Sequence, residues 1–383
     1  MDRRSCGSGS QLLHVDLHID EEEPRRGVLE LLRRLRPHWE EQDIQMKTFT
    51  EGITNQLIGC YVAALQEPGC VLVRLYGRMT ELYVNRRREM EMLQLLHHHG
   101  CGPQIYCSFT NGICYEFTRG TVLDDQLLRE PSIYRLIAAE MGRIHSIQPE
   151  CGRPVEPLLW KKMSHFLTLV QSSSSPAEQP ATKRGVSLPS VQTLSAEMES
   201  LRTHLSQVCS PTVLCHNDLL TKNIIYNHSD GTVKFIDYEY ADYNYQAFDI
   251  GNHFNEFAGV SEVDYSLYPG LDLQRDWIRV YLQSFKQSAG GDDVVVTVTE
   301  EEVTQLYVQV CKFSLASNFF WGLWAILQSR FSSIDFDFHR ASLEDIKGDQ
   351  QPSQHALLHR KPTRLSSEEN LHDGNMLSVL TRC

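Results

Sequence analysis

The chain has 383 residues, 41% hydrophobic and 22% charged, with a formal net charge of −13. That length accommodates one large or two ordinary domains, and the composition is typical of a soluble enzyme. The negative charge disfavours nucleic acid as the main partner and a general affinity for anionic membranes. The eleven cysteines are scattered without a Cys-x-x-Cys pair, which indicates free thiols in a reducing compartment.

The N-terminal part predicts a helix and then a group of strands. Residues 1–26 are polar, lack a secretory signal and are expected to be flexible. Residues 27–36 have the apolar spacing of an amphipathic helix. Two strands follow within residues 45–62, joined by a polar loop at 49–55. Backbone N–H groups around Thr54 and Asn55 are candidates for binding an anion there. An ordinary hairpin turn is the alternative, because the loop lacks Gly-x-Gly-x-x-Gly.

Further elements alternate between strands and helices. A strand is predicted at residues 71–76, a helix at 86–99 with Met90, Leu93 and Leu96 on its buried face, and a hairpin within 105–117. Residues 133–147 have the spacing of a core helix. The segment 171–190 is rich in Ser and Pro and predicts a disordered surface insertion.

Polar side chains follow short β-branched runs in residues 213–256. Asp218 and Asn223 come after the first run, and Asp237 follows a hairpin that turns at residues 229–231. Two carboxylates and an amide at one end of a sheet suit Mg²⁺, which completes its coordination with water and phosphates. An acidic group left free of the metal can accept a proton from a hydroxyl. These are the components of phosphoryl transfer.

Towards the C-terminus the sequence predicts helices at residues 272–285 and after Thr299, separated by a mobile linker at 288–293. The most apolar stretch, 313–327, is too short to span a bilayer and contains Ser317 and Asn318. We therefore expect a buried helix and no transmembrane segment.

The central residues resemble a known family. His216-Asn217-Asp218, Asn223 and Ile236-Asp237 resemble the catalytic and metal-binding loops of kinase-like phosphotransferases. The continuation through Tyr238-Glu239-Tyr240 and Asp-Ile-Gly-Asn-His-Phe-Asn-Glu at 249–256 resembles the choline/ethanolamine kinases, and residues 255–260 resemble the ethanolamine branch. The resemblance covers roughly residues 33–340 and is dense in motifs.

The resemblance implies an α+β, bilobal protein-kinase-like fold. A small β-rich N-lobe would span residues 27–117 and a larger, mainly helical C-lobe 118–340. The implied reaction is ATP-dependent phosphorylation of ethanolamine to phosphoethanolamine in the cytoplasm, the first step of the CDP-ethanolamine route to phosphatidylethanolamine. Asp218 would then be the catalytic base, and Asn223 and Asp237 the Mg²⁺ ligands. A homodimer is left open.

The same resemblance implies residues for both substrates. Arg74 would bind nucleotide phosphates and pair with Glu89. Residues 115–118 resemble the hinge that binds adenine, which assigns Glu116 and Phe117. A cationic amine needs carboxylates and aromatic faces, and the candidates are Glu239, Asp249, Glu256, Trp321 and Trp324. The alternative for the tryptophans is a place in the core.

The sequence departs from the family after residue 340. Residues 341–383 form a polar tail, predicted disordered, in place of a closing amphipathic helix. A catalytically impaired variant therefore stays open, as does a kinase for choline or another amino alcohol. A protein kinase is disfavoured because Ala-Pro-Glu and the Gly-rich loop are missing. A different class, a metal-dependent phosphoesterase using His216, Asp218, Asp237 and Asp249, would act without ATP.

Overall fold

The computed structural model describes residues 12–49, 55–66, 68–77, 80–149, 155–172, 189–259, 264–290 and 295–331. It divides into two compact units, Met1–Thr121 and Val122–Cys383. The division at residue 121 lies close to the predicted one at 117. The first unit is a mixed sheet with two helices and the second is mainly helical, which confirms the predicted kinase-like α+β fold.

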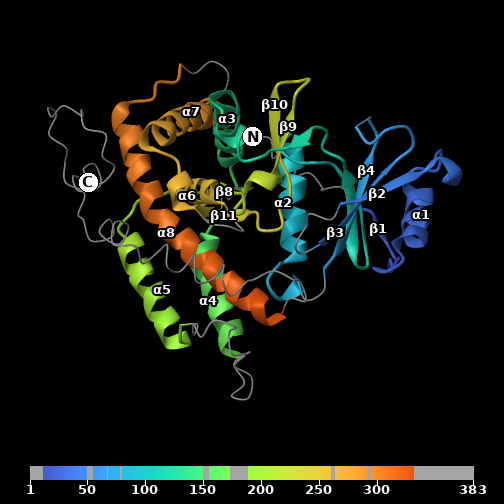
Figure 1. Cartoon of the computed structure of the whole chain (residues 1–383), viewed down its shortest axis with the longest axis horizontal. Helices are drawn as coiled ribbons and strands as arrows, with labels where there is room; N and C mark the ends of the chain where they lie inside the picture. Colours follow the sequence, from blue (N-terminus) through green and yellow to red (C-terminus); the bar gives the residue numbers. More distant parts are fainter. Residues whose placement is uncertain are drawn as a thin grey trace, which may run out of the picture. The chain divides into compact units, whose positions relative to one another are not determined.

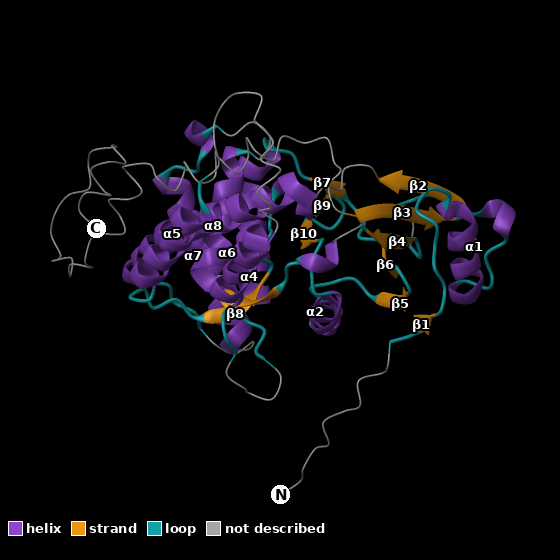
Figure 2. Ribbon diagram, turned by 90° about the horizontal axis from the view of Figure 1, so that it is seen from below, coloured by secondary structure: helices purple, strands orange, loops and turns teal. Residues whose placement is uncertain are grey.

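The first unit is built on a six-stranded sheet in the order β1-β5-β6-β4-β3-β2 (Figure 2). Its pairs are antiparallel except β1 with β5. On the central strand β4, Arg74 lies opposite Leu57 and Ile113. The strands are β1 (His14–Val15), β2 (Gln45–Phe49), β3 (Asn55–Tyr61), β4 (Val71–Tyr76), β5 (Ile105–Phe109) and β6 (Gly112–Glu116).

Helix α1 (Pro24–Leu35) packs its apolar stripe on one face of this sheet (Figure 2). The spacing predicts Val28, Leu31, Leu32 and Leu35 on this stripe; the first three are buried and Leu35 is partly buried. The expectation that residues 1–26 are flexible is wrong for the described residues 12–26. Val15 and Ile19 are buried in the same core, so these two side chains attach the segment to the unit. Residues 1–11 lie outside the described part.

Helix α2 (Arg86–His98) is capped at its N-terminus by Asn85, whose side chain accepts the Arg88 N–H. Its buried face contains Glu89, Met92, Leu93 and Leu96. The expectation of Met90 on this face is corrected, because Met90 is only half-buried and the buried Glu89 takes part of the stripe instead. A charged side chain at a buried position needs a partner, and Glu89 has two, described below.

The second unit consists of helices around short strand pairs (Figure 1). Its core contains Trp277, Tyr281, Phe248, Phe254 and Phe313, all fully buried. The helices are α3 (Pro131–His145), α4 (Leu158–Ser172), α5 (Val191–Leu205), α6 (Gln246–Asn255), α7 (Leu271–Gly290) and α8 (Glu300–Phe331). Single 3-10 turns lie at Leu127–Arg129, Thr221–Asn223, Glu256–Ala258 and Tyr265–Leu267.

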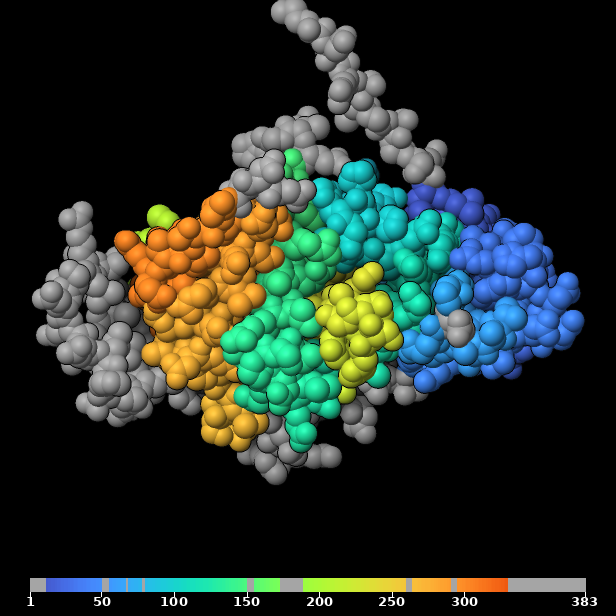
Figure 3. Space-filling view, turned by 90° about the horizontal axis from the view of Figure 1, so that it is seen from above, coloured from blue at the N-terminus to red at the C-terminus, as the bar shows by residue number. Residues whose placement is uncertain are grey.

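The predicted hairpin is present as β9 (Ile224–Asn227) and β10 (Thr232–Phe235), with Gly231 at φ +63° in its turn. The left-handed conformation there favours glycine. β9 also pairs with β7 (Thr121–Val122). The hairpin, yellow in Figure 3, lies at the surface beside α3. The first run of the central stretch, β8 (Thr212–Cys215), pairs instead with β11 (Asp242–Tyr245) in a separate sheet, so the expectation of one sheet is corrected.

Helix α8 packs closely against α6. A Cβ at Gly251 would lie 2.9 Å from the Ser314 backbone nitrogen, so glycine is needed where the helices approach. α8 begins with a capping box, in which Thr299 and Glu302 satisfy each other's backbone N–H. It is longer than predicted, with 32 residues. By length and composition Glu300–Ser329 could cross a membrane. However, 83% of its most apolar segment is buried inside the protein, as in the core helix of a soluble protein.

Two predictions of irregular structure are wrong for the residues that are described. Residues 171–172 end α4, and Ser190 caps α5 by accepting the Thr193 N–H, so these residues of the insertion expected at 171–190 are ordered by helices. Residues 288–290 belong to α7 rather than to the linker expected at 288–293. Residues 173–188, 291–294 and the tail 341–383 lie outside the described residues.

Candidate active site

The loop from β8 to β9 carries Asp218 and is fixed by its neighbours. Asn217 has φ +67°, a left-handed conformation that Asn tolerates better than most residues. Its side chain donates to the Tyr240 carbonyl at 2.9 Å and accepts from the Asn244 amide at 2.8 Å. Asn217 and Asn244 are both buried. Asn217 is therefore held by hydrogen bonds to two other residues, which fixes the position of the adjoining Asp218 backbone.

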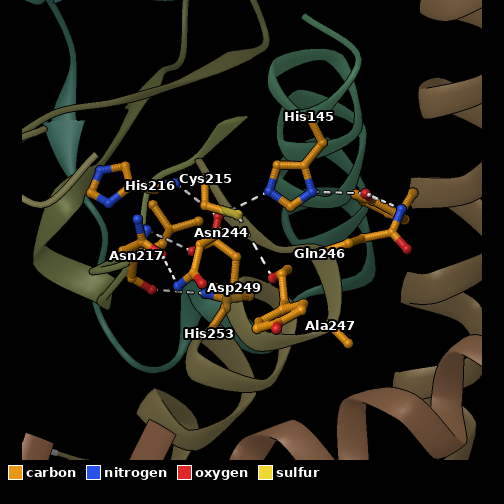
Figure 4. A network of polar contacts seen from close by, with 12 residues as sticks. His145, Cys215, His216, Asn217, Asn244, Gln246, Ala247, Asp249 and His253 are labelled. Carbon is orange, nitrogen blue, oxygen red and sulfur yellow. Dashed lines mark hydrogen bonds and ion pairs between the residues drawn. The ribbon is translucent and has the colours of Figure 1, made fainter. Parts of the chain in front are cut away.

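The side chain of Asp249, on α6, holds the same loop by accepting backbone N–H groups of the loop (Figure 4). The two carboxylate oxygens accept the N–H groups of His216 at 2.8 Å and Asn217 at 2.7 Å. His145 Nε2 adds a contact of 2.9 Å to Oδ2, and its Nδ1 lies 2.7 Å from the Tyr281 hydroxyl. Burial alone would raise the pKa of Asp249, but His145 and His216 lower it below its usual value. Asp249 is therefore a buried carboxylate anion inside the protein.

This geometry corrects the expectation that Asp249 binds the amine. Its side chain is 0% exposed, and both oxygens are used by the loop. The spacing of seven residues between Asp249 and Glu256 suggested that both lie on one helix face. In the structure Glu256 is half-exposed, whereas Asp249 is buried. Asp249, His145 and Cys215 also lie close enough to hold a metal ion. All three are buried, and the Asp249 oxygens already have donors, so that cluster is part of the loop's support.

The open end of the β9–β10 hairpin brings the predicted metal ligands together. Asn223 directly precedes β9, and the Ile236 N–H donates to the Asn223 carbonyl at 2.9 Å. Asp237 follows at once, at φ +62°, a second left-handed residue other than glycine. The Asn223 amide donates to the Asp218 carbonyl at 2.9 Å. Asp218, Asn223 and Asp237 therefore lie at one end of the hairpin, as the spacing predicts.

His216 connects the loop to this hairpin. Its Nε2 donates to the Ile236 carbonyl at 2.9 Å, and its Nδ1 accepts the Asp218 N–H at 3.3 Å. That pattern requires the neutral tautomer with the proton on Nε2. Burial lowers the pKa of His216, which agrees with a neutral ring. His216 thus braces the loop by hydrogen bonding.

Asp218 lies among several carboxylates. The side chain is half-buried. Desolvation raises the pKa of Asp218 well above its usual range, and the nearby carboxylates of Glu256, Asp237, Glu239 and Asp249 raise it further. Like charges at close range disfavour ionisation. The site therefore has an excess of negative charge.

A divalent cation fits this charge and these ligands. Hard cations prefer oxygen ligands, and Mg²⁺ usually takes one or two carboxylates. Asp237 offers a carboxylate. The amide nitrogen of Asn223 donates to the Asp218 carbonyl, and its side-chain oxygen would be the second ligand. Cation charge would also lower the raised pKa of Asp218.

Two predicted amine-binding tryptophans form an aromatic cluster with Tyr240. Trp324 Nε1 donates to the Tyr240 hydroxyl at 2.8 Å, and Trp321 Nε1 donates to the Asn252 side chain at 2.7 Å. The Trp321 ring meets both the Tyr240 and the Trp324 ring edge-on, with centroids 5.3 and 5.6 Å apart. Both tryptophans are half-buried. They are therefore held in fixed orientations without being enclosed in the core.

Two acidic residues lie near Asp218, and one of them adjoins Tyr240 of this cluster. Glu239 precedes Tyr240 and is 8% exposed, and Glu256 starts the 3-10 turn after α6. Both act electrostatically on Asp218. Glu239 also acts on Lys162, a lysine of α4 that the sequence analysis did not select. The carboxylates therefore extend from the proposed base to the aromatic cluster.

In the first unit, Arg74 and Glu89 form the expected ion pair. Both side chains are almost fully buried, and Arg86 Nη1 adds a second contact to Glu89 at 3.0 Å. Burial alone would raise the pKa of Glu89, but Arg74 and Arg86 lower it below its usual value. Two cations for one carboxylate leave a net positive charge here, which suits a phosphate.

The structure gives less support to the other residues that are predicted to bind the nucleotide. Thr54 lies outside the described residues. The Asn55 side chain accepts from Arg86 at 3.2 Å and from the Gly77 N–H at 3.4 Å. The Glu116 and Phe117 N–H groups donate to the Gln104 and Cys70 carbonyls, so hinge binding of adenine through these two N–H groups is not supported.

Sequence reasoning missed the residues that support the site. Asn244, Asn252 and Lys162 act through contacts between distant segments, for which periodicity gives no signal. His253 is a fourth. It is fully buried, and its Nδ1 donates to the Leu219 carbonyl at 3.0 Å, next to Asp218. Burial lowers the pKa of His253 to about 4. A buried histidine inside a polar motif was the available signal.

Comparison with known proteins gives consistent matches. Residues 46–347 match the family model described as Choline/ethanolamine kinase. Ethanolamine kinase 2 of Homo sapiens is 50% identical over 327 residues, which are 85% of this chain and 81% of that protein. Ethanolamine kinase 1 of Mus musculus is 50% identical over 329 residues, 85% of this chain and 89% of that protein.

Solved structures show the same likeness. An ethanolamine kinase of Plasmodium vivax superposes with a TM-score of 0.74 at 27% identity, covering 89% of this chain and 92% of that one. A choline kinase of Cryptosporidium parvum superposes with a TM-score of 0.69 at 24% identity, covering 86% and 95%. The second likeness supports the fold alone.

Proposed function

Because the chain belongs to the choline/ethanolamine kinase family, we propose that it transfers the terminal phosphoryl group of ATP to the hydroxyl of ethanolamine, giving phosphoethanolamine. The observation that supports this most is the placement of Asp218 beside Asn223 and Asp237 at one end of a hairpin, amid excess negative charge. The product is the first intermediate of the CDP-ethanolamine route to phosphatidylethanolamine.

In this proposal Asp218 accepts the proton of the attacking hydroxyl. Its loop is fixed by Asp249, Asn217 and His216, so the carboxylate is presented without rearrangement. Positioning of this kind contributes much of the rate in phosphoryl transfer, because the protein does little covalent chemistry.

Asn223 and Asp237 would hold Mg²⁺. When bound, the ion neutralises phosphate charge during transfer. The excess of carboxylates around Asp218 supports this assignment, because without a cation they raise the pKa of the base. Arg74 is assigned to the nucleotide phosphates, with Glu89 orienting its guanidinium. Thr54, Asn55, Glu116 and Phe117 remain predictions for the rest of the nucleotide.

The amine is assigned to Trp321, Trp324, Glu239 and Glu256. Aromatic faces and carboxylates attract an ammonium group, and these four residues adjoin Asp218 or Tyr240. We place the enzyme in the cytoplasm, because the scattered cysteines indicate a reducing compartment. A homodimer remains a prediction.

The test is an ATP-consumption assay with and without Mg²⁺, comparing ethanolamine with choline. Asp218→Ala should abolish turnover, whereas Asp230→Ala, in the exposed turn of the hairpin, should retain it. Equal turnover of Asp218→Ala and the unaltered chain would remove Asp218 from the mechanism. ATP binding without turnover in the unaltered chain would favour an impaired variant.

A metal-dependent phosphoesterase is the candidate from another class. It would need His216, Asp218, Asp237 and Asp249 on one ion. Asp249 is occupied by backbone N–H groups, and both His216 ring nitrogens are engaged. The geometry does not favour this activity, and phosphoester hydrolysis without ATP would be its signature.

A further inference from the structure

A lysine lies among the aromatic and acidic residues assigned to the amine. Lys162, on α4, places its Nζ 5.8 Å from the centroid of the Tyr240 ring and 5.6 Å from that of Phe166. An ammonium group is attracted to an aromatic face within about 6 Å. Tyr240 also contacts Trp321 and accepts the hydrogen bond of Trp324. Lys162 and the two tryptophans assigned to the substrate's amine therefore all contact the side chain of Tyr240.

The carboxylates near Lys162 are shared with the site as well. Asp242 and Glu239 both interact electrostatically with its ammonium. Glu239 is also one of the carboxylates that act on Asp218. Burial lowers the pKa of Lys162 to about 8, so most of this side chain is charged at pH 7. A positive charge from the chain itself is thus built into the surroundings of the proposed amine site.

We propose that Lys162 determines which amino alcohol is accepted, by occupying with its ammonium the aromatic and acidic surroundings that a quaternary ammonium would need. This inference rests on the proposed function. A trimethylated ammonium has no N–H group, so its recognition depends on aromatic faces. A primary ammonium has three donors and is held by hydrogen bonds to carboxylates such as Glu256. Lys162 therefore favours ethanolamine over choline.

Discrimination of this kind has two physical parts. A cation already on the Tyr240 ring repels a second cation that must approach the same ring closely. It also partly neutralises Glu239, which lessens the long-range attraction for any substrate cation. A primary ammonium recovers that loss through short, charged hydrogen bonds, and a quaternary one does not.

The test measures kcat and KM for ethanolamine, its N-methyl and N,N-dimethyl forms, and choline. Lys162→Met keeps an unbranched side chain of similar length without the charge, and Lys162→Gln is a second neutral replacement. We expect the preference for ethanolamine over choline to fall by roughly tenfold or more in both, the scale of change for one discriminating contact. The change should appear mainly as a lower KM for choline.

Two controls separate charge from structure. Lys162→Arg retains the charge and should retain most of the preference. Lys161→Met alters the exposed neighbour on the same helix and should leave both constants unchanged. Circular dichroism and the thermal transition verify that each variant is folded.

The outcomes are distinct from those for the proposed function. Folded Lys162→Met or Lys162→Gln with the original preference would overturn the inference and leave the kinase assignment intact. The unaltered enzyme gives a second readout that depends on no variant: its kcat/KM should fall with each added methyl group, and a flat series would overturn the inference. If neither ethanolamine nor choline is phosphorylated, the proposed function itself fails.

Discussion

The Asp249 carboxylate accepts the backbone N–H of Asn217 at 2.7 Å, so a buried side chain of α6 holds the residue that precedes the proposed base. His216 is held by the other oxygen. The contact joins two positions 32 residues apart and holds the loop of Asp218 in place.

Asp249→Asn should lower both stability and kcat. One oxygen becomes an NH₂ group that cannot accept, so a buried backbone N–H loses its partner at a cost of about 1–3 kcal/mol. Urea unfolding measures the first effect and steady-state kinetics the second. Asp276→Asn removes a partly exposed pair with Arg135 and should cost about 1 kcal/mol or less. Similar losses in both variants would contradict the assigned role of Asp249.

Asp218→Asn should stabilise the metal-free protein while abolishing activity. The raised pKa of Asp218 means that the folded state disfavours the ionised form, whereas the unfolded chain ionises freely above the usual pKa of Asp. At pH 7 the ionised side chain therefore opposes folding, and removing its charge relieves this. Each kcal/mol gained corresponds to roughly 2–4 °C in Tm for a domain of this size.

The measurement is a thermal transition in a chelator-containing buffer. Asp230→Asn, in the exposed turn, serves as the control and should change Tm little. A lower Tm for Asp218→Asn would show that the carboxylate cluster does not destabilise the fold.

The contribution of His253 to stability should fall as the pH drops from about 6.5 to about 4. Burial lowers the pKa of His253 to about 4, so below its usual pKa of 6.5 the unfolded chain binds a proton that the folded protein refuses. Each such proton contributes a slope of about 1.4 kcal/mol per pH unit. His216, whose pKa is also lowered, contributes in the same direction.

His253→Gln keeps a donor for the Leu219 carbonyl but does not titrate. Its unfolding free energy, measured by urea at several pH values, should depend less steeply on pH in that window. His97→Gln, at the exposed end of α2, should reproduce the original curve. An unchanged slope in His253→Gln would rule out the buried neutral ring as a cause.

Glu89→Gln should strongly destabilise the first unit and raise the KM for ATP. It leaves the buried Arg74 and Arg86 without their counter-charge, and breaking a buried pair costs about 3–5 kcal/mol. Urea unfolding and ATP kinetics report the two effects. Glu91→Gln, which pairs with Arg87 and Arg88 at the surface, should cost less than about 1 kcal/mol. A normal KM for ATP in Glu89→Gln would remove the pair from nucleotide binding.

Trp324→Phe should raise the KM for ethanolamine with little effect on kcat. The variant keeps an aromatic face but loses the Nε1 donor to Tyr240, so the cluster loses its fixed orientation. Loss of binding that is equal in ground and transition states appears in KM. Trp160→Phe loses a comparable bond to Tyr245 at 3.3 Å and should be neutral for KM. A change confined to kcat would place Trp324 outside the amine site.

The sequence predicted the elements and the local motifs well. The hairpin that joins Asn223 to Asp237, the Arg74–Glu89 pair and the start of α8 after Thr299 all follow from short-range spacing or a dense family motif. Short-range patterns determine the local backbone, and the local backbone places these side chains.

What could not be predicted depends on long-range contacts. Asp249 has a carboxylate in the right motif, but only the packing of α6 against the loop shows that it faces inward. Met90 and Met92 have the same chemistry, and the sequence analysis selected Met90 where the structure buries Met92. Lys162 has no motif at all, and its importance follows from Tyr240, far along the chain.

Tyr240 participates in both halves of the proposed reaction. Its carbonyl accepts the Asn217 amide, which fixes the loop of the base, and its hydroxyl accepts the Trp324 indole, which fixes the wall for the amine. A movement of the backbone at this position would displace the proton acceptor and the substrate's anchor together. Evolution of a new amine preference through this wall would therefore alter turnover as well, which makes residues that contact the Tyr240 side chain alone the easier route to changed selectivity.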